Sequence, residues 1–267
     1  MRDLKSLFDL SGRVALVTGG AGFIGSTIAD ALAELGASIA VVDLRRDAIE
    51  EVCSRLRNDR GAETVAIPVD LEDEMALRTI PAVTTQMFGR IDILVNCAAL
   101  VGTCDLEGWG VPFADQSAKT WRRALEVNLT APFILSQICA DELAKSAHGS
   151  IVNLLSIYGL SGPDERLYEG TSMGNPAAYG AGKAGLLQLT RHLATTLAPN
   201  VRCNAITPGG VERHQSPAFV ERYIARTPLQ RMAVEEDLKG AAAFLASDAS
   251  SYVTGQNIVV DGGWTAW

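Results

Sequence analysis

The 267-residue sequence predicts an α/β protein in which helices cover both faces of a doubly wound parallel sheet. Two observations lead to this prediction. Apolar runs of strand length alternate with longer amphipathic segments, as repeated strand–helix–strand units require. A glycine-rich stretch also follows the first apolar run directly, at the point where the chain must turn tightly into the next helix.

The first half of the sheet is predicted from four apolar runs. Residues 13–18 (RVALVT), 38–43 and 63–69 form the first three strands. Residues 91–95 (IDILV) form a fourth strand that is short and apolar enough to be central. The amphipathic segments that follow the first three strands predict helices over residues 23–35, 47–58 and 72–88.

The second half repeats the pattern. The next predicted strands cover residues 150–155 (SIVNLL), 200–206 and 257–260. The helices expected between them cover residues 119–127, 131–145, 178–197 and 234–246. Repeated right-handed crossovers of this kind place helices on both faces of the sheet.

No linker, charge run or low-complexity stretch divides the sequence, so we expect a single domain over residues 1–267. One segment, residues 157–178, breaks the rhythm because it is irregular and rich in glycine, proline and charge. Loops of this length are uncommon in compact domains and are often lids or binding loops. We therefore expect an enlarged substrate loop there, with a tolerated surface insertion as the alternative.

The composition restricts the function classes. The net charge of −8 argues against nucleic-acid binding, which needs a concentrated basic face. No window approaches the apolar length of a membrane span and the N-terminus lacks a signal-peptide core, so we expect a cytoplasmic protein. The five cysteines form no CxxC pair and the three histidines do not cluster, so we expect neither a disulfide framework nor a metal site.

The glycine-rich stretch at residues 18–25 (TGGAGFIG) predicts a phosphate-binding turn. Gly19, Gly22 and Gly25 lack Cβ atoms and let the backbone turn tightly and approach a pyrophosphate. The helix that begins near Phe23 and Ile24 presents free N–H groups and a positive dipole end to an anion. A structural turn is the alternative, but the position between a strand and a helix favours a Rossmann-like dinucleotide site.

Asp43 ends the second predicted strand and bears on the choice of cofactor. A carboxylate at this place can accept hydrogen bonds from both hydroxyls of the adenosine ribose, and it would repel the 2′-phosphate of NADP. Arg45 and Arg46 follow Leu44 and could instead bind that phosphate. Because Asp43 comes first, we expect NAD; a simple turn or helix cap is the alternative role for Asp43.

Tyr179 and Lys183 stand four residues apart at the start of a predicted helix, so their side chains emerge on one face. A tyrosine with an ordinary pKa of about 10 is a poor base at neutral pH. A nearby ammonium group, helped by an oxidised nicotinamide, would stabilise the phenolate and lower that pKa. The pair could then exchange a proton with an alcohol or a carbonyl, although the spacing alone is a weak signal.

Taken together, the motifs resemble the short-chain dehydrogenase/reductase family in its single-domain branch. The resemblance runs from about Gly12 to Gly263 and includes a typical C-terminal tail from TPLQRM to VVDGG. The motifs, in order, are TGGAGFIG at 18–25, Asp70-Leu71, NCAA at 96–99, Asn128, Ser156, YGAGK at 179–183 and Pro208-Gly209.

The resemblance implies an NAD(H)-dependent oxidoreductase that interconverts a hydroxyl and a carbonyl. Tyr179 would be the general acid/base, and Lys183 would tune it and hold the nicotinamide ribose. Ser156 would hydrogen-bond the substrate oxygen, and Asn128 would hold a water that links Lys183 to solvent. Taken alone, Ser156 could cap a turn and Asn128 could bridge backbone groups.

The resemblance also implies a cofactor site. Asp70 would contact the adenine, Asn96 and Ala98 would line the ribose site, and residues 208–211 would face the nicotinamide. The full set expected at the cofactor is Gly19, Gly22, Phe23, Ile24, Gly25, Asp43, Leu44, Asp70, Leu71, Asn96, Ala98, Tyr179, Lys183, Pro208, Gly209 and Val211. A homo-oligomer, tetramer or dimer, is implied as well.

Three features depart from the common pattern. Phe23 stands where single-domain members usually carry the middle glycine. The resulting spacing of Gly19, Gly22 and Gly25 resembles that of the longer, two-domain sugar epimerases and dehydratases. Too few residues follow Pro208 for an added substrate domain, so we interpret Phe23 as a local variation. The threonine often found after the Pro-Gly pair is replaced by residues 211–214 (VERH), which leaves the carboxamide contact unassigned.

The third departure is the long separation between Ser156 and Tyr179. Ser161 and Ser172 lie within this interval and are alternatives for the catalytic serine. The surrounding IVNLLSIYG sequence selects Ser156.

The loop sequence YEGTSMGNPAAYGAGK is similar to a subgroup associated with bacterial sugar and nonulosonic-acid pathways. It suggests a polar, sugar-derived and anionic alcohol or ketone as the small-molecule substrate. Polar and cationic contacts could come from Asp164, Glu165, Arg166, Arg213 and His214, with solvated surface charge as the alternative. Two other functions remain open: a nucleotide-sugar epimerase or dehydratase that retains its NAD, and a cofactor-binding regulator without turnover.

Overall fold

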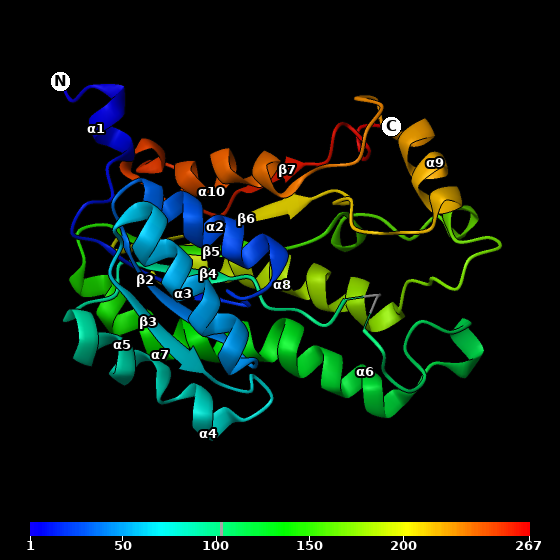
Figure 1. Ribbon diagram of the computed structural model, residues 1–267, viewed down its shortest axis with the longest axis horizontal. Helices are drawn as coiled ribbons and strands as arrows, with labels where there is room; N and C mark the ends of the chain where they lie inside the picture. The colour runs from blue at the N-terminus through cyan, green and yellow to red at the C-terminus, as the bar shows by residue number, and fades with distance from the viewer. Residues whose placement is uncertain (102–103) are drawn as a thin grey trace.

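The computed structural model describes residues 1–101 and 104–267 and shows the predicted α/β class. Within those residues the chain forms a seven-stranded sheet in the order β3-β2-β1-β4-β5-β6-β7, with every neighbouring pair parallel. The strand order reverses between β1 and β4, which makes the sheet doubly wound. Figure 1 shows helices in front of and behind this sheet.

The strands lie close to the predicted ranges because they are runs of β-branched and small apolar residues. They are β1 (Val14–Thr18), β2 (Ser38–Asp43), β3 (Thr64–Pro68), β4 (Ile93–Asn96), β5 (Gly149–Leu154), β6 (Val201–Pro208) and β7 (Asn257–Val260). Strand β6 continues beyond its predicted end at residue 206. Central strands β1, β4 and β5 are buried along their whole length, as expected of a sheet covered on both faces.

Side chains alternate along each strand between two apolar cores. Ala15 and Val17 of β1 point into one core, whereas Leu16 points into the other. The first core is covered by α2 (Phe23–Glu34), α3 (Arg46–Arg60) and α10 (Lys239–Ala246). The second is covered by α5 (Ile80–Phe88), α7 (Ala131–Lys145) and α8 (Ala177–Thr196).

Two predicted helical regions differ in their boundaries. The single helix predicted over residues 72–88 is two helices, α4 (Glu74–Leu77) and α5, because Pro81 in the first turn of α5 cannot continue an earlier helix. The helices predicted over residues 119–127 and 131–145 are continuous. Helix α6 (Ala118–Leu125) passes through a π-helical segment (Glu126–Thr130) into α7.

Two helices were not predicted, α1 (Leu4–Phe8) and α9 (Pro217–Arg226). Helix α9 begins with a proline, which suits a first turn, and it buries Phe219 and Tyr223 one turn apart. The predicted loop over residues 157–178 contains two short 3-10 turns, Ile157–Gly159 and Glu165–Leu167. It ends slightly earlier than expected because α8 begins at Ala177.

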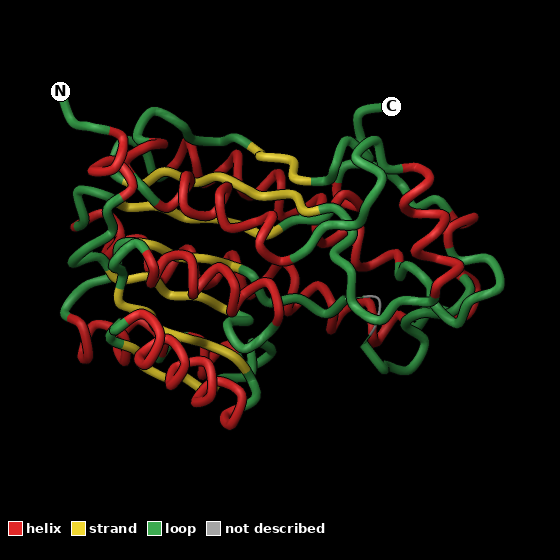
Figure 2. Tube along the Cα trace, turned by 45° about the horizontal axis from the view of Figure 1, so that its top comes forward, coloured by secondary structure: helices red, strands yellow, loops and turns green. Residues whose placement is uncertain are grey.

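The carboxyl ends of the parallel strands meet at one edge of the sheet. Helix α9 and the long loops lie beyond this edge, whereas the N-terminus and α1 lie at the opposite side (Figures 1 and 2). In open α/β sheets, ligands bind at the carboxyl edge near the point where the strand order reverses. We therefore expect a ligand site at the loops that follow β1 and β4.

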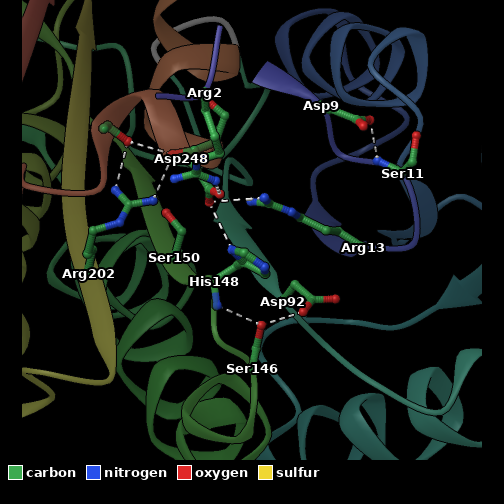
Figure 3. A network of polar contacts seen from close by, with 12 residues as sticks. Arg2, Asp9, Ser11, Arg13, Asp92, Ser146, His148, Ser150, Arg202 and Asp248 are labelled. Carbon is green, nitrogen blue, oxygen red and sulfur yellow. Dashed lines mark hydrogen bonds and ion pairs between the residues drawn. The ribbon is translucent and has the colours of Figure 1, made fainter. Parts of the chain in front are cut away.

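At the opposite edge of the sheet, where the strands begin, a polar network surrounds Asp248 (Figure 3). The Asp248 carboxylate pairs with Arg2 at 2.6 Å, with Arg13 at 3.0 Å and with His148 Nδ1 at 2.8 Å. Burial alone raises the pKa of Asp248, but the hydrogen bond from Arg2, the charge of Arg13 and the contact with His148 lower it overall. The network links the first residues of the chain to its C-terminal part.

No helix in the described part of the chain combines the length and the apolar character that crossing a membrane would require.

Candidate active site

The glycine turn connects β1 to α2 at the carboxyl edge of the sheet. Gly19 has a φ of 62°, and a Cβ atom there would lie 2.7 Å from the Ala98 Cα. A Cβ on Gly25 would lie 2.1 Å from the Gly19 carbonyl oxygen, so the turn can close against the helix only with glycine at both positions. No described side chain caps α2 at Gly22, and its first N–H groups can bind an anion. This cradle fits the diphosphate of a dinucleotide.

Asp43 lies at the end of β2 beside the glycine turn. Its carboxylate accepts hydrogen bonds from the N–H groups of Leu44 at 2.9 Å and Ala21 at 3.2 Å, so it also stabilises the turn. The Arg45 guanidinium donates to the Ala21 carbonyl oxygen at 3.1 Å and lies 4.0 Å from Asp43. Asp43 and Arg45, which would have opposite effects on the binding of a 2′-phosphate, therefore lie next to each other at the end of β2.

Three buried polar side chains lie at matching positions of neighbouring strands, close to the carboxyl ends of those strands. Thr18 of β1 is in register with Asn96 of β4, which is in register with Asn153 of β5. Thr18 Oγ1 accepts hydrogen bonds from the N–H groups of Cys97 and Ala98, at 3.1 and 3.3 Å. Asn96 Nδ2 donates to Asn153 Oδ1, but the buried Asn96 Oδ1 has no partner among the described residues. A bound donor would satisfy this oxygen.

Ser156 and Tyr179 are distant in the sequence and meet because glycines allow close packing. The 3-10 turn after Ser156 lies against the first turns of α8. A Cβ on Gly159 would lie 2.9 Å from the α8 backbone, and one on Gly180 would lie 2.9 Å from a carbonyl oxygen of the turn. This contact brings Ser156 close enough to Tyr179 for its hydroxyl to lower the pKa of the phenol.

Tyr179 and Lys183 share one face of α8, as the spacing predicts. Lys183 is buried, and its Nζ lies 5.9 Å from the centre of the Tyr179 ring and donates to the Leu154 carbonyl oxygen at 2.6 Å. Burial lowers the pKa of Lys183 to about 8. Burial also raises the pKa of Tyr179, while the nearby Ser156 hydroxyl and the charge of Arg213 oppose that rise. In the free protein the phenol is therefore a proton donor at neutral pH.

Asn128 lies in the π-helical segment and is buried. Its Oδ1 accepts a hydrogen bond from the Leu100 N–H at 2.7 Å, and its Nδ2 donates to the Leu100 carbonyl oxygen at 3.0 Å. A Cβ on Gly182 would lie 3.3 Å from the Asn128 Cβ, so α8 packs directly on this segment. The side-chain amide thus bridges backbone groups, and a water near it would have to bind the segment through its backbone.

The remaining predicted cofactor residues follow β3 and β6. Asp70 is exposed and accepts a hydrogen bond from the Glu72 N–H at 2.9 Å, while Leu71 is buried. Pro208 ends β6, and Gly209 and Val211 continue into the next turn. These residues lie at the same edge of the sheet as the glycine turn, as parallel strands require.

The side chains that support the turn after β6 were not among the predicted site residues. The Tyr223 hydroxyl accepts a hydrogen bond from the Gly210 N–H at 2.6 Å. The Tyr223 ring stacks on the buried Trp264, with centroids 5.9 Å apart and planes inclined by 16°. The spacing of Phe219 and Tyr223, one helical turn apart, is the local signal that could have placed Tyr223 on an inward face.

The enlarged loop packs on α9. Leu167 is buried, and Asp164 forms ion pairs with Arg166 at 2.8 Å and with Arg226 of α9. Arg222 of α9 donates to two carbonyl oxygens of the loop, at 3.3 and 2.5 Å. Asp164 and Arg166 were expected to offer substrate contacts, but the structure uses their charges to anchor the loop. Glu165 and His214, from the same expected set, are exposed.

The anchored loop brings a further phenol toward Tyr179. The hydroxyls of Tyr158 and Tyr168 lie 2.5 Å apart, and Tyr168 belongs to the loop. Burial is the main reason that the pKa of each is raised, and the charge of Tyr179 contributes to both. No sequence motif predicts this pair, which adds two hydroxyl groups to the aromatic cluster near Tyr179.

The site therefore combines an anion-binding turn, a phenol that can donate a proton and a buried ammonium group. Within the described ranges, no cluster of three or more His, Cys, Asp or Glu side chains is placed to hold a metal ion. Such a set can bind a dinucleotide and exchange a proton with an oxygen of a second molecule.

Known proteins share this architecture. Residues 19–265 match the family described as enoyl-(acyl carrier protein) reductase. The cis-4-hydroxycyclohexanecarboxylate dehydrogenase of Sinomonas cyclohexanicum is 34% identical over 259 residues, which cover 95% of this chain and 97% of that protein.

Solved structures agree with the sequence match. A gluconate 5-dehydrogenase from Burkholderia cenocepacia J2315, in complex with NADP and tartrate, gives a TM-score of 0.88 at 29% identity over 99% of this chain and 100% of that chain. NAD⁺-bound xylitol dehydrogenase gives a TM-score of 0.82 at 30% identity over 95% and 99% of the two chains. Since one structure holds NADP and the other NAD⁺, similarity of fold does not select the cofactor.

Proposed function

This chain belongs to the short-chain dehydrogenase/reductase family, and we propose that it is an NAD(H)-dependent enzyme that interconverts a secondary alcohol and a ketone on a polar small molecule. The family gives an oxidoreductase with a nicotinamide cofactor. The observation that carries the finer proposal is the meeting of Ser156, Tyr179 and Lys183 beside a turn that fits a dinucleotide.

Tyr179 is assigned the proton transfer. A nicotinamide cofactor bound at the glycine turn would supply the hydride acceptor for oxidation of the alcohol carbon and the hydride donor for reduction of the carbonyl carbon. The Tyr179 phenol gives a proton to the substrate oxygen during reduction and takes it back during oxidation. The Ser156 hydroxyl donates a hydrogen bond to the same oxygen and stabilises the negative charge that develops on it.

Lys183 is assigned the tuning of Tyr179. Its ammonium group is fixed by the Leu154 carbonyl oxygen and is mostly charged at neutral pH, since its pKa is about 8. A positive charge beside the Tyr179 ring would favour the phenolate form. Asn128 is assigned a supporting role, in which it holds the Leu100 backbone beside α8.

The preference for NAD rests on Asp43. Its carboxylate lies at the end of β2, where it would accept hydrogen bonds from the adenosine ribose and repel a 2′-phosphate. Arg45 contacts the carbonyl oxygen of Ala21 and approaches Asp43, so one nearby cation is already engaged. This arrangement supports NAD rather than NADP.

A polyol or hydroxy acid is the proposed substrate class. The named relatives act on a hydroxycyclohexanecarboxylate, a gluconate and a xylitol. The Tyr158 and Tyr168 hydroxyls lie in the aromatic cluster near Tyr179 and can exchange hydrogen bonds with substrate hydroxyl groups. These groups favour a sugar-derived molecule over an apolar ketone.

We also propose a homo-oligomer. Trp121 of α6 and Phe133 of α7 are 38% and 45% exposed on adjoining helical segments, and Val259 on the edge strand β7 is 41% exposed. Apolar groups gathered along helices in this way suit a contact between copies of the chain.

The function is tested by following reduced-nicotinamide absorbance with NAD⁺ and NADP⁺ against a panel of polyols, hydroxy acids and apolar secondary alcohols. Signal with NAD⁺ and polar alcohols is the expected result. Turnover of apolar alcohols with none of polar ones would contradict the substrate class. Interconversion of epimers without net NADH would instead assign an epimerase, and cofactor binding without any reaction would assign a regulator.

A further inference from the structure

Two residues at which the sequence departs from its family lie against each other in space. Phe23 replaces the middle glycine of the glycine turn, and Arg213 lies where a threonine is usual after the Pro-Gly pair. The Arg213 guanidinium carbon lies 4.5 Å from the centre of the Phe23 ring, in a cation–π contact. The two departures are thus one structural feature, which joins the glycine turn to the turn after β6.

The backbone and one edge of Arg213 are held in place. The Arg213 N–H donates to Gln215 Oε1 at 2.5 Å, and Gln215 Nε2 donates to the Val211 carbonyl oxygen at 2.7 Å. Arg213 Nε donates to Glu235 Oε1 at 3.2 Å. These contacts fix the direction of the side chain, so the guanidinium is pre-organised over the ring rather than free in solvent.

The outer edge of the guanidinium remains available. Its two terminal nitrogens make no hydrogen bond to any described residue, and the side chain is 30% exposed. Phe23 is the first residue of α2, so the guanidinium lies on the side chain with which the helix after the glycine turn begins. The Arg213 charge also acts on Tyr179 and Cys97, whose pKa values it lowers against the effect of burial. The Arg213 charge is therefore felt on the side of Tyr179 and Cys97, while the Phe23 ring beneath it is 63% exposed.

We propose that Arg213 binds the diphosphate of the dinucleotide and that Phe23 is the platform that holds its guanidinium there. A guanidinium can make two parallel hydrogen bonds to phosphate oxygens, which are stronger than neutral ones. The helix N-terminus and Arg213 would approach the anion from different sides. The turn that lacks the threonine would thereby contribute a charged contact to the diphosphate, and the carboxamide contact stays unassigned.

A substrate carboxylate is the competing ligand for Arg213. It is less favoured because the ring beneath the guanidinium belongs to the glycine turn, whereas the substrate loop contributes no contact to this side chain among those described. The test therefore uses ligands that carry the diphosphate but not the substrate.

The test is calorimetric titration of NADH and of ADP-ribose into the wild-type protein and into Arg213→Gln. Both ligands carry the diphosphate, and ADP-ribose lacks the nicotinamide. Loss of a charge-assisted contact should raise both dissociation constants by about tenfold to a hundredfold. The dissociation constants of Arg213→Lys should lie between those of the wild type and those of Arg213→Gln, because lysine keeps the charge but loses the two parallel hydrogen bonds.

Phe23→Leu tests the platform separately. Loss of the cation–π contact should raise the NADH dissociation constant by about twofold to fivefold in the wild-type background. The same change should have little effect when Arg213 is already Gln, because the two residues act as a unit. Equal effects in both backgrounds would overturn the role of Phe23 as a platform.

Arg231→Gln is the matched control. Arg231 is also paired to a carboxylate, that of Asp237 at 2.6 Å, but it has no aromatic partner in the described structure. It should leave both dissociation constants unchanged. Unchanged affinity for NADH and ADP-ribose in Arg213→Gln would overturn the proposal, and a raised KM for substrate in that variant would then assign Arg213 to the substrate.

The inference goes beyond the proposed function and can fail independently of it. It requires a dinucleotide but neither a particular substrate nor a choice between NAD and NADP, because both carry the diphosphate. Turnover that depends on Tyr179, together with unchanged ADP-ribose binding in Arg213→Gln, would reject the inference and keep the function. If the wild-type protein binds ADP-ribose tightly but turns over no substrate, and Arg213→Gln loses that binding, the inference holds and the proposed function is rejected.

Discussion

Lys183 is an ammonium group buried away from water, and its pKa is lowered from 10.5 to about 8. Between these two values the unfolded chain binds more protons than the folded one, so this residue makes stability rise as pH rises from 8 to 10.5. Below that window the buried charge opposes folding. Its retention therefore indicates a role other than stability.

Lys183→Met should stabilise the cofactor-free protein at pH 7 while removing activity. The gain is expected to reach about 2–3 kcal/mol, or several degrees in Tm, because a buried charge is replaced by an apolar chain of similar length. Thermal melts from pH 6 to 11 should show the gain vanish above the upper pKa. Lys183→Arg keeps the charge and should not stabilise; a Lys183→Met protein less stable than wild type at pH 7 would contradict this reasoning.

Asp43→Ala should weaken discrimination against NADP. The substitution removes the carboxylate that would repel the 2′-phosphate and leaves Arg45 and Arg46 nearby. The ratio of kcat/KM for NADP to that for NAD is expected to rise at least about tenfold, the effect of one charged contact. Arg46→Ala serves as the control. An unchanged ratio in Asp43→Ala would shift the assignment to the arginines.

Single residues of the site could be predicted where their motif is local. The glycine turn, Asp43 and the Tyr179–Lys183 pair follow from spacing along one element, and the structure places them at one edge. The contact of Arg213 with Phe23 could not be predicted, because the residues lie at distant positions and meet through the folded path of two turns. The Asn128 amide was expected to hold water, and its pairing with Leu100 depends equally on tertiary packing.

The enlarged loop and α9 form one element of the substrate side. Asp164 links the loop to Arg226, and its pKa is lowered to about 2, first by the hydrogen bond from Arg166. A lowered carboxyl pKa means that the link stabilises the protein above about pH 4 and is lost as pH falls through 2. At physiological pH Asp164 is therefore ionised and can keep its ion pair with Arg226 of α9.

Asp164→Asn should loosen this loop without affecting cofactor binding. KM for the alcohol is expected to rise about threefold to tenfold, because Tyr168 would no longer be fixed beside Tyr158, while the NADH dissociation constant stays constant. Hydrogen exchange of residues 160–176 should accelerate. Glu165→Gln, which changes the exposed residue next to Asp164, is the control. Unchanged hydrogen exchange in Asp164→Asn would contradict the proposal that Asp164 fixes the loop on α9.

Elements with a clear period were predicted closely, and those governed by local chemistry were not. Strands β2 and β7 match their predicted ranges because apolar runs end at polar or turn residues. The break between α4 and α5 depends on Pro81, whose effect on the preceding turn was overlooked. Helix α9 is short, and its inward face is an aromatic cluster with Trp264 that exists only in the folded protein.

The two edges of the sheet carry different features. The carboxyl edge carries the proposed chemistry, and the amino edge carries the polar network around Asp248 (Figure 3). That network joins Arg2 and Arg13 near the start of the chain to His148 and to the segment after α10. It connects parts of the molecule that share no strand pair.

Asp248→Asn should destabilise the whole protein and leave its chemistry intact. It removes the charge beside the buried Arg13, at a cost of about 3 kcal/mol, whereas Arg2→Gln removes an exposed partner and should cost less than about 1 kcal/mol. Denaturant unfolding measures both. Because the folded pKa of Asp248 is lowered, the cost should shrink as pH falls below 4; equal effects of the two variants would contradict the network.

The central claim is that Tyr179 transfers a proton while hydride moves between the substrate and the nicotinamide. The most direct measurement compares turnover and NADH binding in wild type and Tyr179→Phe, with the best alcohol from the panel. The account predicts a loss of turnover of at least about a hundredfold, the usual contribution of a general acid or base, with a dissociation constant for NADH within about twofold of wild type. Near-native turnover in Tyr179→Phe would contradict it.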